Sequence, residues 1–381
     1  MNGRPSEVDL FERELAEFYG VRHVAALSSG SAAVLAALAA LEMEPGTEVI
    51  TSPLTDPGVV MGVLFLGCVP VFVDHDYDTI AVSPSAIQSA ITERTGAIVV
   101  THLMGLISDM DAIMRVARSH HVPVIGDSAQ AHGACYGGSR SRPFGDIGAV
   151  SMMSTKHMTS GGQGGFIATD NEGYYLAAKR FADRGKPFGL PSPPEGAPHG
   201  GDRSTLGLNC RMHDLEAVVG RVQLTKLHQV MTARACVLRE LNEGLAEVAG
   251  VKPVRIYDGT EPSPWGAVFV LDRHSTSVSV RRFAAAMTAE GIATVPLIPD
   301  MVPVIDELSF LRDQEHADRA RYPYGYELRG RKVRFVRPEH PVIDRLANDL
   351  IVIWIHEGWG AQEIVDTLAA LRKVASAYRV A

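Results

Sequence analysis

The apolar residues in the first half of the chain follow two alternating patterns. Short runs rich in β-branched residues favour strands, and the longer amphipathic or Ala- and Leu-rich runs between them favour helices. The expected strands are 48–51, 69–74, 96–102, 122–127, 147–153 and 164–169, and the expected helices include 30–42, 84–92 and 109–121. Apolar strands separated by helices indicate a parallel or mixed sheet that is covered on both faces.

The second half of the chain predicts a further, smaller domain. Residues 184–205 are rich in Pro and Gly and predict a long loop, which in a compact domain is usually functional or mobile. The expected elements after it are a helix at about 212–247, strands near 266–271, 292–297 and 350–355, and a final helix near 361–378. We therefore expect a large α/β domain over residues 1–235 and a smaller C-terminal α+β domain over 236–381.

The charge and composition of the chain indicate which partners and which cellular location to expect. The 381 residues include 36 Lys and Arg and 44 Asp and Glu, a net charge of −8, which disfavours nucleic acid as a partner. The four cysteines lie far apart without a CxxC pair, which suits a reducing compartment. The N-terminus has no apolar signal core, and no run approaches the roughly 20 apolar residues of a membrane span. We expect a cytoplasmic protein with no membrane partner and no metal site.

The segment Ser28-Ser29-Gly30-Ser31-Ala32 opens the expected helix 30–42. The free N–H groups and the positive end of a helix favour an anion, and Gly30 would let a ligand approach closely. An ordinary helix N-cap uses the same residue types, so this segment alone leaves both interpretations open.

Asp127 stands at the end of the expected strand 122–127. In open α/β sheets, ligands bind at the carboxyl ends of the strands. A carboxylate there can bind a metal, accept a proton or pair with a cationic ring nitrogen, but it can also cap the next turn.

Lys156 follows the expected strand 147–153 and precedes a run of glycines at 161–165. Burial lowers the pKa of an amine and frees it as a nucleophile, so a lysine among small and apolar residues suits Schiff-base chemistry. An isolated lysine is more often a surface residue. The order of the three segments strengthens the functional interpretation, because pyridoxal phosphate needs an anion site, a carboxylate for its ring nitrogen and an amine for its aldehyde.

The chain resembles the DegT/DnrJ/EryC1/StrS family, the pyridoxal-phosphate sugar aminotransferases with the aspartate-aminotransferase fold. The resemblance covers about residues 10–375. It is densest in EVITSPLTDPG, VFVDHDYDTIAVSPSAI, GDSAQAHGACYGG, SMMSTKHMTSGGQGGFIATD and LGLNCRMHDLEAVVGRVQL. It implies a fold type I large domain with a mostly parallel mixed sheet, and pyridoxal 5′-phosphate as the cofactor.

The resemblance also implies roles for single residues. Lys156 matches the lysine that carries the cofactor, and Asp127 matches the acid that pairs with the pyridine nitrogen. Gln130 matches a residue that contacts the ring or its hydroxyl group, and Ser151 matches a phosphate-binding serine.

Further matches concern the phosphate and a second subunit. Gly30, Ser31 and Ala32 match the helix start that holds the phosphate. Asn209 matches the asparagine that a neighbouring subunit lends to the phosphate, which implies a homodimer with two shared sites.

The chain departs from the family pattern at three places. Asp56 stands where many relatives have an aromatic residue that stacks on the cofactor ring. Gln163 replaces the usual acidic residue of the glycine run, and the familiar His-Tyr segment is not evident in 294–306. A branch that replaces the lysine with histidine has dehydratase activity, but here His stands only at 157, next to Lys156.

The expected function is transfer of an amino group from glutamate or glutamine to a nucleotide-linked keto-sugar or a keto-cyclitol, in secondary-metabolite or surface-polysaccharide biosynthesis. A nucleotide would need a basic surface, for which Arg184, Lys186, Arg203 and Arg211 are candidates, although Arg211 fits a donor carboxylate or a structural ion pair equally well. Two alternatives stay open. One is a dehydratase or amino-cyclohexene-forming enzyme on the same scaffold, which the unusual Asp56 and Gln163 suggest, and the other is a non-catalytic regulator that binds the cofactor.

Overall fold

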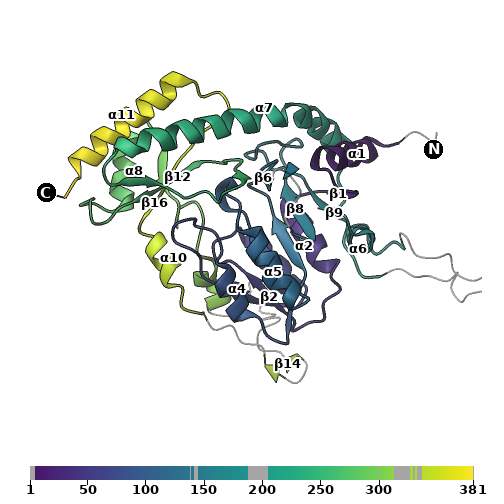
Figure 1. Cartoon of the computed structure of the whole chain (residues 1–381). Coiled ribbons are helices and arrows are strands. Elements are labelled where there is room, and N and C mark those ends of the chain that lie inside the picture. The colour runs from purple at the N-terminus through teal and green to yellow at the C-terminus, as the bar shows by residue number, and fades with distance from the viewer. Residues whose placement is uncertain are drawn as a thin grey trace, which may run out of the picture.

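The computed structural model describes residues 5–137, 139–140, 145–187, 205–298, 300–312, 327–328, 331–332 and 337–380. Most of the predicted loop 184–205, including Arg203, lies outside the described residues. The chain forms a large sheet covered by helices and a second, smaller sheet near the C-terminus (Figure 1).

The large sheet has seven strands in the order β1-β9-β8-β5-β4-β2-β3. β9 runs antiparallel to β1 and β8, and the other neighbouring pairs are parallel, which confirms the predicted mixed, mostly parallel sheet. The strands are β1 (His23–Leu27), β2 (Glu48–Thr51), β3 (Val69–Phe72), β4 (Thr95–Thr101), β5 (Val124–Asp127), β8 (Ile147–Ser151) and β9 (Gly165–Thr169).

Helices cover both faces of this sheet. One apolar core joins one face of the strands to α2, α3 and α6, and two further cores join the other face to α4 and α5 and to α1 and α7. Side chains alternate between the two faces along β1. Ala25 and Leu27 enter the core with α2, α3 and α6, whereas Val24 and Ala26 enter the core with α1 and α7 on the other face. The helices are α1 (Glu7–Tyr19), α2 (Gly30–Ala39), α3 (Pro57–Phe65), α4 (Pro84–Ala90), α5 (Met110–Ser119), α6 (Glu172–Ala182) and α7 (Asp214–Gly244).

Polar caps set the starts of the helices that begin at the carboxyl edge of the sheet. The Ser29 hydroxyl accepts a hydrogen bond from the N–H of Ala32 at 3.0 Å and begins α2. Asp56 caps α3, with Pro57 at its first position, and Asp109 caps α5. Ser and Asp are favoured N-caps because their side chains satisfy N–H groups that a helix leaves free, and Pro has no N–H to satisfy.

The second sheet is antiparallel, in the order β10-β12-β16-β13. α8, α11 and the C-terminal part of α7 pack on one face, while the other face packs against Leu54, Ile80, Leu103 and Met104 of the preceding region. The elements are β10 (Val251–Pro253), β12 (Ala267–Leu271), β13 (Thr294–Pro296), β16 (Leu350–Ile353), α8 (Val280–Ala289), α9 (Ser309–Arg312), α10 (Pro341–Leu346) and α11 (Ala361–Ala377). α7 runs from α1 to α11 in Figure 1, and the domain boundary predicted at 235/236, which falls inside α7, stays a prediction.

Short elements complete the description. β6 (Cys135–Tyr136) pairs with β7 (Ser139–Arg140) and with β11 (Thr260–Glu261), and β14 (Glu327–Leu328) pairs with β15 (Arg331–Lys332). Single turns of 3₁₀-helix lie at Leu103–Gly105, Leu245–Glu247 and Ile305–Glu307. Among the described residues, no helix is both long and apolar enough to cross a membrane.

The periodic segments of the sequence identified most of these elements within a few residues of their ends. β1 was not predicted, because the five residues His23–Leu27 include two alanines and have weak strand propensity. α3 was not predicted either, because its nine residues are apolar on all sides and show no helical period.

Candidate active site

A cavity of about 220 Å³ lies where the N-termini of α2 and α3 meet the carboxyl ends of β5 and β8. Most of the predicted site residues line it, namely Gly30, Ser31, Asp56, Asp127, Gln130, Ser151 and Lys156, together with Gln163. Ala32 is buried behind the first turn of α2, and Asn209 is exposed and lines a different hollow. The fold thus brings residues from five separate segments to one place.

The start of α2 approaches the end of β8 closely. A Cβ atom at Gly30 would lie 2.5 Å from the Cβ of Ser151, and a Cβ at Gly58 would overlap the hydroxyl of Ser31. At Gly30 a side chain would meet the end of β8 itself, and at Gly58 it would displace the hydroxyl of Ser31, so space rather than backbone angle favours glycine at both positions. The two glycines leave the hydroxyl groups of Ser31 and Ser151 beside the helix end, where they can contact an anion.

The backbone N–H groups at the start of α2 differ in whether they already have a hydrogen-bond acceptor. Ala32 already donates its N–H to the hydroxyl of Ser29, so its backbone is used by the N-cap. The N–H groups of Gly30 and Ser31 have no acceptor within the helix because they belong to its first turn. The N-cap and the anion site, which the sequence left as alternatives, are thus compatible.

Asp127 ends β5 and is buried. Burial raises the pKa of its carboxyl group to about 6, although a hydrogen bond from the N–H of Ala129 at 3.1 Å and the charge of Lys156 oppose the shift. A cationic ring nitrogen beside this carboxylate would favour its charged form.

Lys156 lies five residues after the end of β8, in a loop between Ser151 and the glycine run. Burial lowers the pKa of its amine to about 8, and the carboxylates of Asp127 and Asp56 partly oppose this. A fraction of the amine is therefore uncharged near neutral pH and can act as a nucleophile.

Gln130 and Asp56 border the cavity from two different elements, the loop after β5 and the N-cap of α3. The side-chain oxygen of Gln130 accepts a hydrogen bond from the N–H of Met104 at 2.7 Å, which fixes the amide. Asp56 is exposed and its carboxylate accepts a hydrogen bond from the N–H of Gly58 at 2.8 Å. Helix capping accounts for an aspartate at this position, which the sequence marked as a departure from the expected pattern.

Two buried histidines, His132 and His157, form hydrogen bonds at the loop that carries Lys156. The ring of His132 donates through Nε2 to the carbonyl of Ser151 at 2.6 Å, and the ring of His157 donates through Nε2 to the carbonyl of Ser263 at 3.0 Å. Burial lowers the pKa of His132 to about 4 and that of His157 well below its usual range. Both rings are neutral at pH 7; His132 holds the carbonyl at the end of β8, and His157 ties the lysine loop to Ser263.

The predicted basic candidates surround one buried carboxylate. Arg184, Lys186 and Arg211 approach Asp183 at 3.2, 2.6 and 3.3 Å. Arg211 also donates to the side-chain oxygen of Asn209 at 3.1 Å. Arg211 thus forms a structural ion pair, one of its two expected roles.

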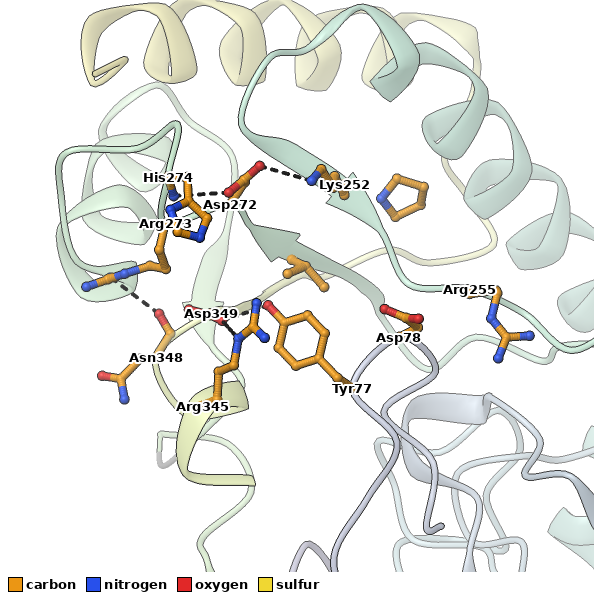
Figure 2. A pocket seen from close by; sticks show the side chains of 12 residues that line it. Tyr77, Asp78, Lys252, Arg255, Asp272, Arg273, His274, Arg345, Asn348 and Asp349 are labelled. Carbon is orange, nitrogen blue, oxygen red and sulfur yellow. Dashed lines mark hydrogen bonds and ion pairs between the residues drawn. The ribbon is translucent and has the colours of Figure 1, made fainter. Parts of the chain in front are cut away.

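A larger hollow, of about 620 Å³, lies between the β3–α4 loop and the second sheet (Figure 2). Its lining contains none of the predicted site residues, and four of its charged groups form two ion pairs with each other. Lys252 pairs with Asp272 at 2.9 Å, and the Tyr77 hydroxyl donates to Asp349 at 2.7 Å. The smaller cavity is therefore the candidate active site.

The groups around Lys156 fit pyridoxal phosphate. The helix end with Ser31 and Ser151 suits a phosphate, the buried Asp127 suits a cationic ring nitrogen, and the amine of Lys156 suits an aldehyde. Together with the seven-stranded sheet, this defines a pyridoxal-phosphate enzyme of fold type I.

Comparison with known proteins then gives the family. A model of the DegT/DnrJ/EryC1/StrS aminotransferase family matches residues 3–331, and the chain belongs to this family. It is a pyridoxal-phosphate-dependent aminotransferase, as the sequence predicted.

Individual relatives show how far the similarity extends. GDP-perosamine synthase of Caulobacter vibrioides is 36% identical over 238 residues, which are 62% of this chain and 62% of that protein. L-glutamine:2-deoxy-scyllo-inosose aminotransferase of Streptomyces fradiae is 32% identical over 309 residues, 81% of this chain and 69% of that protein. The X-ray structure of an aminotransferase from Psychrobacter cryohalolentis matches with a TM-score of 0.82 at 28% identity, and the match covers 98% of this chain and 92% of that one.

One residue of this site carried no signal in the sequence. Trp265 lies with its ring 3.7 Å from the Nζ atom of Lys156, measured to the ring centroid. It follows Ser263-Pro264, far from Lys156 in the chain, and no spacing links the two.

Replacing Asp127 by Asn is expected to stabilise the cofactor-free protein at neutral pH. The pKa of Asp127 is 3.8 for the free group and about 6 in the fold, so the folded chain binds more protons between these values and its free energy of unfolding falls as the pH rises from 4 to 6. Asp127→Asn removes that loss and should raise the free energy of unfolding at pH 7 by about 3 kcal/mol, with no gain below pH 4.

Urea unfolding at pH 4 and pH 7 measures this effect. The control is Asp366→Asn, at an exposed position of α11, which should leave both values nearly unchanged. A variant at Asp127 that is no more stable than the wild type at pH 7 would contradict the assignment of a buried, costly carboxylate.

Proposed function

We propose that this enzyme transfers an amino group from L-glutamine or L-glutamate to a ketone of a nucleotide-linked sugar or a cyclitol. The observation that carries the proposal is the single cavity that joins the amine of Lys156, the carboxylate of Asp127 and the start of α2. The names of the relatives support the substrate class, since one makes GDP-perosamine and another aminates a deoxy-inosose with L-glutamine.

Each residue of the cavity has a distinct role in this reaction. When bound, pyridoxal phosphate supplies an electron sink that stabilises negative charge on the carbon next to the transferred nitrogen. Lys156 holds the cofactor through its amine and, once released, accepts and returns a proton at Nζ, for which a pKa of about 8 is well suited. Asp127 keeps the ring nitrogen protonated, and Gly30, Ser31 and Ser151 hold the phosphate.

A homodimer with shared sites is part of this proposal. The exposed side chains Leu206, Leu208, Leu215, Val218, Val219 and Val222 lie in the segment before α7 and on its first turns. An exposed apolar surface of this kind is typical of a protein interface. Asn209 lies in the same segment, is exposed and does not line the cavity of its own chain, which supports its contribution to the site of a second copy.

We also infer a cytoplasmic location and a role in sugar or antibiotic biosynthesis. Cys68, Cys135, Cys210 and Cys236 are free thiols in the structure, as a reducing compartment would keep them.

The absorbance spectrum of the protein tests the cofactor and the donor. Added pyridoxal phosphate should give a yellow band, which L-glutamine or L-glutamate should convert to the pyridoxamine form. Lys156→Ala should bind the cofactor but react at least about 10²-fold more slowly, because the group that moves the proton is gone. Lys373→Ala removes an exposed lysine of α11 that pairs with Glu290 and serves as the control.

Product analysis with a keto-sugar or keto-cyclitol completes this test. An aminated product formed together with an equal amount of 2-oxo acid supports transfer. A dehydrated product without amination would contradict the proposal and favour the dehydratase. An absorbance band that neither donor changes would also contradict it and would favour the regulator or the dehydratase.

Charge placed on the apolar face of α7 should separate the dimer. The side chain of Val222 is 52% exposed, and Val222→Asp would bury a carboxylate in the proposed interface. We expect a shift from dimer to monomer in sedimentation velocity. Val365→Asp, on α11 with a 58% exposed side chain, is the matched control and should stay dimeric. An unshifted Val222→Asp protein would place the interface elsewhere.

Mixed dimers test whether Asn209 acts on the partner's site. Lys156→Ala and Asn209→Ala should each be nearly inactive alone. In a mixed dimer, one site would combine an intact Lys156 with an intact Asn209 from the other chain, so mixing should restore activity. If mixing two dimeric variants restores nothing, Asn209 does not act across the interface.

A further inference from the structure

Trp265 covers the amine of Lys156 from the side of the C-terminal region. Its indole ring stands just before β12, and the Nζ atom lies 3.7 Å from the ring centroid. The face of an aromatic ring is electronegative, so this geometry attracts the charged form of the amine, most strongly where water is excluded.

The indole ring is fixed from three directions. Its Nε1–H donates to the carbonyl of Thr155 at 2.7 Å, and its backbone N–H donates to the carbonyl of Met104 at 3.1 Å. The ring of Trp354, the residue after β16, meets it edge to face with 5.5 Å between the ring centroids. The ring is thereby held over the lysine by contacts to both regions of the chain.

The segment Ser263–Trp265, here called the strap, is docked through both backbone groups of Ser263. The N–H of Ser263 donates to the carbonyl of Gly105 at 3.1 Å, and its carbonyl accepts from Nε2 of His157 at 3.0 Å. Gly105 has a φ of +84°, and a Cβ atom there would overlap the carbonyl oxygen of Ser263. The backbone at Gly105 is therefore shaped to receive the strap.

The other charged groups near the amine come from several elements. The carboxylates of Asp127 and Asp56 favour its charged form, and burial opposes it. The rings of His132 and His157 are neutral, and Arg234 of α7 acts on those two rings. Trp265 supplies a contact at the amine that involves no second ionisable group.

We propose that Trp265 is a positioning residue for Lys156, whose indole face holds the protonated amine at the cavity before the cofactor binds. The contact ties the placement of this amine to the docking of the strap. The proposal rests on the proposed function only in treating Lys156 as the group that holds the cofactor, because the contact is a property of the cofactor-free chain.

Fluorescence of a single tryptophan reports the contact directly. The chain has three tryptophans, so Trp354→Phe with Trp359→Phe leaves Trp265 alone. In the cofactor-free full chain, its emission should titrate between pH 6 and 9.5 with the ionisation of the amine. Adding Lys156→Met should abolish the titration, whereas adding Lys186→Met, at a lysine bound to Asp183, should not. No titration, or one that survives Lys156→Met, would overturn the proposal.

Fluorinated tryptophan separates the attraction of the ring from burial. Incorporation of 5-fluoro- and then 5,6-difluorotryptophan into the single-tryptophan variant weakens the negative face and changes the shape little. The titration midpoint should fall stepwise, by up to about one pH unit, since a desolvated cation–π contact and one pKa unit are similar in free energy. An unchanged midpoint would mean that the ring only excludes water from the amine, and it would overturn the proposal.

The same variants keep this test apart from that of the function. A yellow band with pyridoxal phosphate but no titration of Trp265 would overturn only the role of Trp265. A titration without any band would overturn only the assignment of the cofactor.

Discussion

The close approach of α2 to the end of β8 is the contact on which the site depends. It exists because no side chain separates Gly30 from Ser151, and because Gly165 on β9 leaves room for the carbonyl of Ser29. Since β5 lies next to β8 in the sheet, the same edge also presents Asp127. A larger residue at either glycine would push the helix end away and separate the anion site from both the carboxylate and the amine.

Burial acts on the two ionisable groups of the cavity in opposite directions. It raises the pKa of Asp127 and lowers that of Lys156, and each charge partly restores the other. A lone buried carboxylate is unfavourable, and a cation placed beside it removes much of that cost. The cofactor-free site therefore holds free energy that a ligand with a cationic ring nitrogen and an anionic phosphate can release, which favours such a ligand over a neutral one.

The sequence predicted those parts of the site that lie in local patterns. Ser29 and Gly30 open a periodic helix and Asp127 ends an apolar strand, so each was visible from its neighbours. Trp265 was not visible, because its position over Lys156 results from the docking of the strap on Gly105 and His157. Likewise, the sequence marked Asp56 as a departure from the family, but only the hydrogen bond to Gly58 shows that it caps α3. Contacts between segments far apart in the chain leave no periodic signal in either one.

α7 connects the features that were found separately. Its first turns carry the exposed Val218 and Val222, and Val219 lies near the glycine run that follows Lys156. Its last turns place Leu238 and Leu241 in the core of the second sheet, whose strand β12 follows directly on the strap. Residues at both ends of α7 lie in apolar cores, and packed interiors have low compressibility and transmit strain. A second copy seated on the first turns would thus be linked, through one helix, to the sheet that carries Trp265 to the lysine.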